Sequence, residues 1–210
     1  MSEPLSVLLK AQISASALIQ WLDAPVANVT QWDDWRALRG DVYLDGEDRP
    51  IALLSPERMA GLLQRSNDWL LSAGTNRNFA DQMMAHEDLM GYCIYDPKTG
   101  VLNIGAFMLT ESVSGIIAFL VWARSISSYL SKDQSALAIV YPYIWGPVDG
   151  YPVPAALSIG PGATSRLLVE REEQQSMRRA FQPFVDELLL RKAGPDRRQP
   201  PLPNRLPALT

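Results

Sequence analysis

The sequence contains very little cysteine and histidine. Among its 210 residues there is one cysteine, Cys93, and one histidine, His86. A single cysteine excludes an intramolecular disulfide bond and favours a reducing compartment. Zinc sites draw on several histidine and cysteine ligands, and this chain has no second histidine. We therefore expect neither a metal nor another cofactor.

The sequence also lacks an excess of positive charge and a long apolar run. Its 19 basic and 23 acidic side chains give a net charge of −4, which argues against nucleic acid as a partner. The most apolar segment, 112–123, has 12 residues, whereas a membrane-spanning helix needs about 20. Residues 1–6 carry no basic cluster of the kind that opens a secretory signal. We expect a cytoplasmic protein that does not bind membranes.

The remaining composition is typical of one globular domain. Hydrophobic residues make up 47% of the chain and charged residues 20%, which is enough apolar material for a sizeable core. The composition changes at residue 194, after which five prolines occur in seventeen residues. We predict a single domain at 1–193 and an extended, proline-rich tail at 194–210. The tail offers one functional alternative, an adaptor that binds partners through Pro200–Pro203.

Helical spacing dominates the first half of the chain. Apolar residues three and four positions apart predict helices at 14–23 and 31–38, with Thr30 capping the second. The order Ser55-Pro56-Glu57 is typical of a helix start, and Gly74 is expected to end that helix. A shorter helix is predicted at 78–86. The segment 5–13 fits either a helix or a strand.

The second half contains the strand signals. Alternating residues at 90–96 and 101–110, joined by a Pro97–Gly100 turn, predict a hairpin. A helix follows from Ser112 or Ser114 to about residue 130. Further strands are predicted at 136–145, 155–160 and 165–169, and a final helix at 170–192, kinked or split by Pro183. The predicted fold is α+β: a helical N-terminal half, then a mostly antiparallel sheet of four or five strands with helices packed on one face.

The candidate catalytic residues surround the histidine. His86, Glu87 and Asp88 are consecutive, and neighbouring residues on a helix point about 100° apart, so they do not converge on one atom there. Cys93 lies within a predicted strand, where a buried cysteine acts as a small hydrophobe. The enzymatic alternative is a small hydrolase or transferase that uses His86 with Glu87 or Cys93. We expect instead that the chain is not an enzyme.

Aromatic residues gather near the end of the predicted sheet. They either fill the core or line a small-molecule pocket, and the sequence leaves both alternatives open. They are Tyr141, Tyr143, Trp145 and Tyr151.

The most informative feature is an acidic segment in the first quarter of the chain. Between residues 23 and 48 there are seven carboxylates and two arginines, a balance of −5. This is either a solvated surface or a docking patch for a basic protein, and its spacing departs from that of an EF-hand calcium loop. Two tryptophans lie between the acids, a composition typical of a protein-binding anchor. The candidate partner-binding residues are Trp32, Asp33, Asp34, Trp35, Asp41, Asp45, Glu47 and Asp48.

A small, acidic, cysteine-poor α+β domain without a catalytic constellation resembles the immunity proteins of bacterial toxin–immunity pairs. The resemblance is one of general build over the whole chain and includes no shared motif. It implies a protein that binds a cognate, basic toxin and occludes its active site through the acidic surface. The expected partner is therefore a basic protein toxin, and no nucleic acid, membrane or cofactor is expected to bind.

Overall fold

The fold was analysed in a computed structural model of the chain. The structure describes residues 5–38, 51–85, 91–110, 112–141 and 153–192, with side chains through residue 186. These residues form a six-stranded antiparallel sheet in the order β2-β3-β1-β4-β5-β6. The strands are β1 (Leu5–Gln12), β2 (Gly91–Asp96), β3 (Val101–Thr110), β4 (Ala136–Tyr141), β5 (Ala155–Ile159) and β6 (Ser165–Leu167).

The α+β class and the antiparallel sheet are confirmed, but the helical N-terminal half is wrong. The first described element is β1, which lies between β3 and β4 near the middle of the sheet. Val7 and Leu9 are buried on one face of β1 and Leu8 on the other. Because both faces are apolar, the hydrophobic pattern does not distinguish a strand from a helix. Pairing with β3 and β4 decides the conformation.

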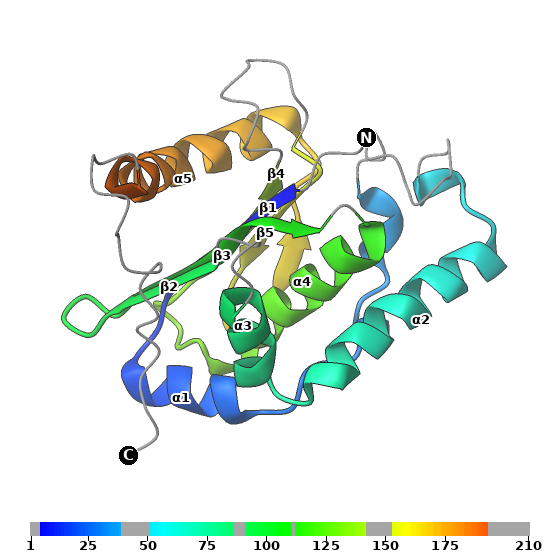
Figure 1. The fold of residues 1–210 in the computed structure, drawn as a ribbon. Helices are drawn as coiled ribbons and strands as arrows, with labels where there is room; N and C mark the ends of the chain where they lie inside the picture. The colour runs from blue at the N-terminus through cyan, green and yellow to red at the C-terminus, as the bar shows by residue number, and fades with distance from the viewer. Residues whose placement is uncertain (1–4, 39–50, 86–90, 111, 142–152, 193–210) are drawn as a thin grey trace.

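Helices cover both faces of the sheet, which corrects the prediction that they pack on one face. In Figure 1, α5 lies on one side of the sheet and the other four helices lie on the opposite side. Between the sheet and α2, the helix α4 is apolar almost all round, as expected of a helix buried on every side. The helices are α1 (Ala15–Asp23), α2 (Pro56–Ala73), α3 (Asn76–Ala85), α4 (Val113–Ser125) and α5 (Arg171–Lys192).

The face under α5 is built by a row of residues in register across the sheet. Tyr92 pairs with Gly105, Gly105 with Leu8, Leu8 with Ile139, and Ile139 with Ala156. Three buried side chains of α5 belong to the same core, which explains why this face needs a covering helix. They are Met177, Phe181 and Val185.

Local signals placed most helix ends correctly. Ser55 accepts a hydrogen bond from the backbone N–H of Arg58, Pro56 begins α2, and Gly74 ends it with φ of 76°. At α4 the cap is Ser112, which accepts from Gly115 N–H. For the last helix the prediction was a kink or a split at Pro183. The split is wrong, because α5 continues through Pro183, whereas the kink stays a prediction.

The predicted helix at 31–38 is replaced by two short 3-10 turns, η1 (Val29–Gln31) and η2 (Asp34–Ala37). The cap is Asn28, whose side chain accepts from Thr30 N–H, so the assignment of Thr30 as the cap is wrong. Within the described residues, no helix combines the length and the apolarity needed to cross a membrane. The predicted proline-rich tail at 194–210 lies outside the described residues, as do 142–145 of the predicted strand.

Tyr92 gives the fold a dependence on alkaline pH. Its side chain is buried, and its hydroxyl has no hydrogen-bond partner among the residues that the structure describes. Burial, with smaller contributions from Tyr141 and Cys93, raises the pKa of Tyr92 well above its ordinary value. In the unfolded chain the Tyr92 hydroxyl ionises at about pH 10, whereas in the folded chain it stays protonated at that pH. The free energy of unfolding therefore falls as pH rises beyond about 10.

Replacement of Tyr92 by phenylalanine is expected to remove this loss. Urea unfolding should show Tyr92→Phe within about 1 kcal/mol of the native protein at neutral pH. At one pH unit above the pKa of Tyr92 in the unfolded chain, the native protein should have lost about 1.4 kcal/mol of unfolding free energy that the variant keeps. Tyr95→Phe is the control: it removes a hydrogen bond to the carbonyl of Ile13 and should destabilise already at neutral pH. Parallel alkaline curves for Tyr92→Phe and the native protein would contradict this assignment.

Candidate functional site

The loop at residues 24–38, which we call the tryptophan loop, carries the first four candidate binding residues. Its beginning is fixed to the junction of α2 and α3. Ala24 O accepts from Asn76 N–H at 3.0 Å, and Val26 N–H donates to Gly74 O at 3.2 Å. The beginning of the loop is therefore held by the neighbouring helices.

The other end of the tryptophan loop is fixed to η3 (Ile51–Leu53) and its flank. The guanidinium of Arg36 donates to the carbonyls of Ala52 at 3.2 Å and Leu54 at 2.9 Å. Within the loop, the indole N–H of Trp35 donates to Val29 O at 3.2 Å. Compact loops fixed at both ends frequently present binding residues on a rigid scaffold.

The middle of the loop surrounds a buried cation, Arg124, from the last turn of α4. Its two terminal nitrogens each donate to one carboxylate oxygen of Asp34 at 2.7 Å. The guanidinium carbon lies 5.4 Å from the ring centroid of Trp32 and 4.7 Å from that of Trp35. Attraction between the cation and both indoles adds to the bidentate ion pair. The cluster is a cation enclosed by one carboxylate and two aromatic rings.

The four candidate residues of the loop differ in what they expose. Trp35 is 2% exposed and fills the core, whereas Trp32 is half-buried. Asp33 is exposed, and the side chain of Asp34 is 35% exposed while it pairs with Arg124. Of these four residues, the ones that contribute to the surface of the loop are thus Trp32 in part, Asp33 and the outer part of Asp34. Four candidates lie outside the described residues: Asp41, Asp45, Glu47 and Asp48.

Sequence reasoning missed Arg124. The signal was available, since this arginine directly follows the apolar segment 112–123 and has no charged neighbour within it. A charge at the end of a buried helix needs a partner or access to water. The partner is ninety residues away in the sequence, so spacing did not identify it.

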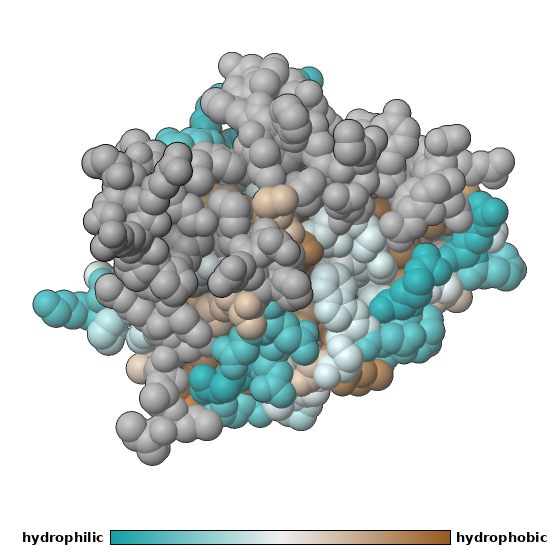
Figure 2. Space-filling view, viewed as in Figure 1, coloured by the Kyte–Doolittle hydropathy of each residue, from teal (hydrophilic) through white to brown (hydrophobic). Residues whose placement is uncertain are grey.

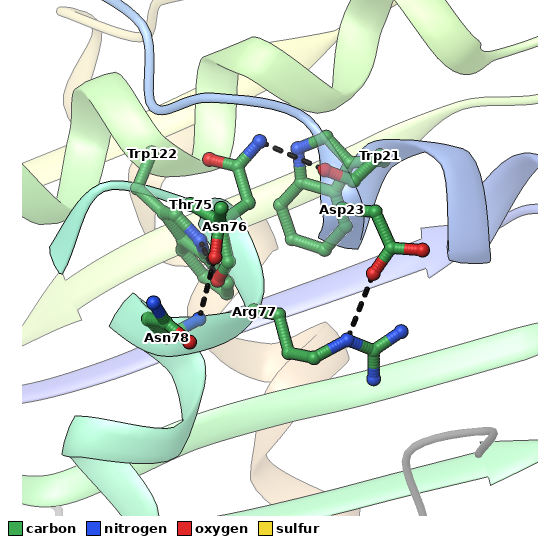
Figure 3. A network of polar contacts seen from close by, with 7 residues as sticks. All are labelled: Trp21, Asp23, Thr75, Asn76, Arg77, Asn78 and Trp122. Carbon is green, nitrogen blue, oxygen red and sulfur yellow. Dashed lines mark hydrogen bonds and ion pairs between the residues drawn. The ribbon is translucent and has the colours of Figure 1, made fainter. Parts of the chain in front are cut away.

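A network centred on Asn76 supports the base of the tryptophan loop, as Figure 3 shows. Asn76 is buried, its side-chain amide donates to Trp21 O at 2.9 Å, and its own carbonyl accepts from the indole N–H of Trp122 at 3.0 Å. The two indoles pack with their centroids 4.8 Å apart. Beside them, Arg77 pairs with Asp23 at 2.9 Å. The network joins α1, α3 and α4 directly beneath the loop.

The residues of the enzymatic alternative do not form a site in the described part of the chain. Cys93 is buried within β2, and His86, Glu87 and Asp88 lie outside the described residues. No group of three histidine, cysteine or acidic side chains that could hold a metal ion occurs among the described residues.

The predicted aromatic cluster is partly visible. Tyr141 is buried in the core beneath α5, whereas Tyr143, Trp145 and Tyr151 lie outside the described residues. Of these four aromatic residues, the structure therefore decides between core and pocket only for Tyr141, which packs in the core.

A cavity of about 330 Å³ lies between the end of α2 and α3. Figure 2 shows mostly hydrophilic side chains along the outer faces of these two helices. The described residues that line it include one carboxylate and no histidine or cysteine, so these residues do not by themselves form a catalytic pair. The lining residues are Ser72, Ala73, Asn78, Asp81, Gln82 and Ala85.

Comparison with protein-family models, curated protein sequences and solved structures finds no match to this chain. Function is therefore argued from the side chains themselves. A fixed loop that exposes an indole and a carboxylate is suited to binding a protein surface.

Proposed function

We propose that this protein is a protein-binding inhibitor of the immunity type, which neutralises a cognate basic toxin by occluding its active site. The tryptophan loop and the four acidic residues that follow it in the sequence, Asp41, Asp45, Glu47 and Asp48, would form the contact surface. The observation that carries the proposal is a loop fixed at both ends that leaves Trp32 and Asp33 accessible.

Two physical arguments support this proposal. A loop that is already ordered loses little conformational freedom on binding, so more of the contact energy appears as affinity. Tryptophan is the residue type most often found as an energetic anchor in interfaces, and neighbouring carboxylates accelerate the encounter with a basic partner. Trp32 would act as the anchor and Asp33 as part of the steering charge.

The experiment first asks whether a basic protein is encoded beside this chain and whether co-expression of this chain suppresses the toxicity of that neighbouring protein. That protein is then the partner in the binding measurements. Trp32→Ala is expected to weaken the complex about 30-fold in calorimetry, the effect of losing an interface anchor of about 2 kcal/mol. Asp33→Lys should slow association several-fold at low salt and much less at high salt. Growth of cells that co-express the toxin should fall in parallel.

Two substitutions elsewhere serve as controls. Asp186→Lys makes the same charge reversal on α5, on the other side of the sheet, and Leu71→Ala removes an exposed apolar side chain from α2. Both should bind as the native protein does. The proposal is wrong if the neighbouring protein forms no complex, or if Trp32→Ala and Asp33→Lys bind no more weakly than the controls.

A further inference from the structure

Arg124 is a charged residue in a position where a hydrophobic residue is expected. It lies in the last turn of α4, whose preceding residues are almost all buried and apolar, and its own side chain is 0% exposed. Removing a guanidinium from water is unfavourable, and a well-packed apolar side chain of similar size is often as stabilising as a buried ion pair. Overall stability therefore gives little reason for an arginine here, and its contacts with the tryptophan loop need a separate account.

Those contacts all converge on the middle of the loop. The ends of the loop are fixed by hydrogen bonds to the α2–α3 junction and to the η3 segment. The middle is oriented from α4, since the guanidinium holds Asp34 through two hydrogen bonds and lies over the rings of Trp32 and Trp35. One planar group thus fixes three of four consecutive side chains and leaves Asp33 facing outward.

We propose that Arg124 is a positioning residue, which holds the tryptophan loop in the conformation that binds the partner. It orients the half-buried ring of Trp32 and neutralises Asp34, so that Asp33 carries the net charge of this turn toward the partner. The proposal rests on the proposed function for its biological meaning. Its structural content, the ordering of residues 32–35 by Arg124, can be measured without a partner.

This role requires the planar guanidinium group of arginine. Arginine donates two parallel hydrogen bonds to one carboxylate while its faces stack on aromatic rings, whereas lysine is a point charge on a flexible stem. Arg124→Lys is therefore expected to loosen the loop even though the charge is kept. This separates positioning from simple charge neutralisation.

The decisive variant removes both charges together. Arg124→Met with Asp34→Asn leaves no unpaired buried cation, so the global unfolding transition should stay close to that of the native protein. Hydrogen exchange followed by mass spectrometry should then show peptides covering 30–38 exchanging at least tenfold faster, with β1, β3 and α4 unchanged. The complex with the partner should dissociate at least tenfold faster, while its association rate changes less than threefold.

The matched control is a second bidentate pair on the other side of the molecule. Arg166 on β6 donates to both oxygens of Glu173 on α5, at 3.3 and 2.7 Å. Removing that pair as Arg166→Met with Glu173→Gln should alter neither exchange in 30–38 nor binding. Arg124→Lys, which keeps the charge beside Asp34, is the second test should the double variant fail to fold, and it should also speed exchange in 30–38.

The inference is overturned if the folded variants exchange at 30–38 as slowly as the native protein. It is also overturned if they lose loop protection but keep the native dissociation rate from the partner. Failure of the proposed function is seen separately, as the absence of any complex with the native chain. In that case the exchange measurement alone decides whether Arg124 positions the loop.

Discussion

Replacement of Gly105 by alanine is expected to prevent stable folding. Gly105 lies in β3, and a Cβ added there would collide with the carbonyl oxygen of Val7 and lie 2.8 Å from the hydroxyl of Tyr92. The Val7 oxygen belongs to the backbone of β1, which is paired on both sides and cannot move without breaking the ladder. Core overpacking usually costs about 1–3 kcal/mol, and a backbone collision belongs at or above the upper end.

A loss of about 3 kcal/mol or more is a large part of the 5–15 kcal/mol by which domains of this kind are stable. Urea unfolding should therefore show a much lower midpoint for Gly105→Ala, or no cooperative transition. Gly61→Ala is the control, because its Cβ meets nothing closer than the end of the Arg65 side chain at 3.8 Å. That substitution within α2 should stabilise by about 0.5–1 kcal/mol. Equal effects of the two substitutions would show that the crowding at Gly105 is relieved.

The strand pairing around Gly105 also shows which parts of the fold the sequence did not predict. The hairpin of β2 and β3 and the start of α2 were predicted because their signals are local: a Pro97–Gly100 turn, and the order Ser55-Pro56-Glu57. The strand β1 was left undecided, because its partners are residues far along the chain, such as Gly105 and Ile139. The side of the sheet on which a helix packs is likewise set by tertiary contacts that local periodicity does not contain.

The candidate site, too, was predicted only in part from the sequence. Composition drew attention to Trp32 and Asp33, and these are accessible in the structure, although their contact with a partner stays a prediction. Composition did not separate them from Trp35, which is buried, or from Asp34, which is paired. That distinction depends on Arg124, which reaches the loop from another element. Charge patterning can therefore indicate a binding segment, whereas the division of roles within it requires the fold.

The second large effect is expected for Asn76→Asp, which changes one buried atom. The side-chain amide of Asn76 is 1% exposed and donates to Trp21 O at 2.9 Å. In the variant a carboxylate oxygen would face that carbonyl oxygen, and a charge would be buried while Arg77, the cation drawn in the network (Figure 3), already pairs with Asp23. At neutral pH this should destabilise the protein by about 3 kcal/mol or more. The packing of Trp21 against Trp122 would be disturbed with it.

Acid should partly reverse this defect, because a protonated carboxyl can donate its O–H to Trp21 O. Burial and the facing carbonyl raise the pKa of the introduced carboxyl above about 3.9, the value in the unfolded chain. The deficit relative to the native protein should therefore be small below pH 4 and grow as pH rises through the folded-state pKa. Urea unfolding of both proteins between pH 4 and pH 7 measures this difference.

Asn78→Asp, two residues further along α3, is the matched control. Asn78 is exposed, and its amide donates to Ala73 O at 2.9 Å. A carboxylate in the first turn of a helix is favourable, so this variant should stay within about 1 kcal/mol of the native protein. A deficit for Asn76→Asp that is the same at pH 4 and pH 7 would contradict the hydrogen-bond direction in the network. A deficit confined to Asn76 and relieved by acid would establish that this amide donates to α1 beneath the tryptophan loop.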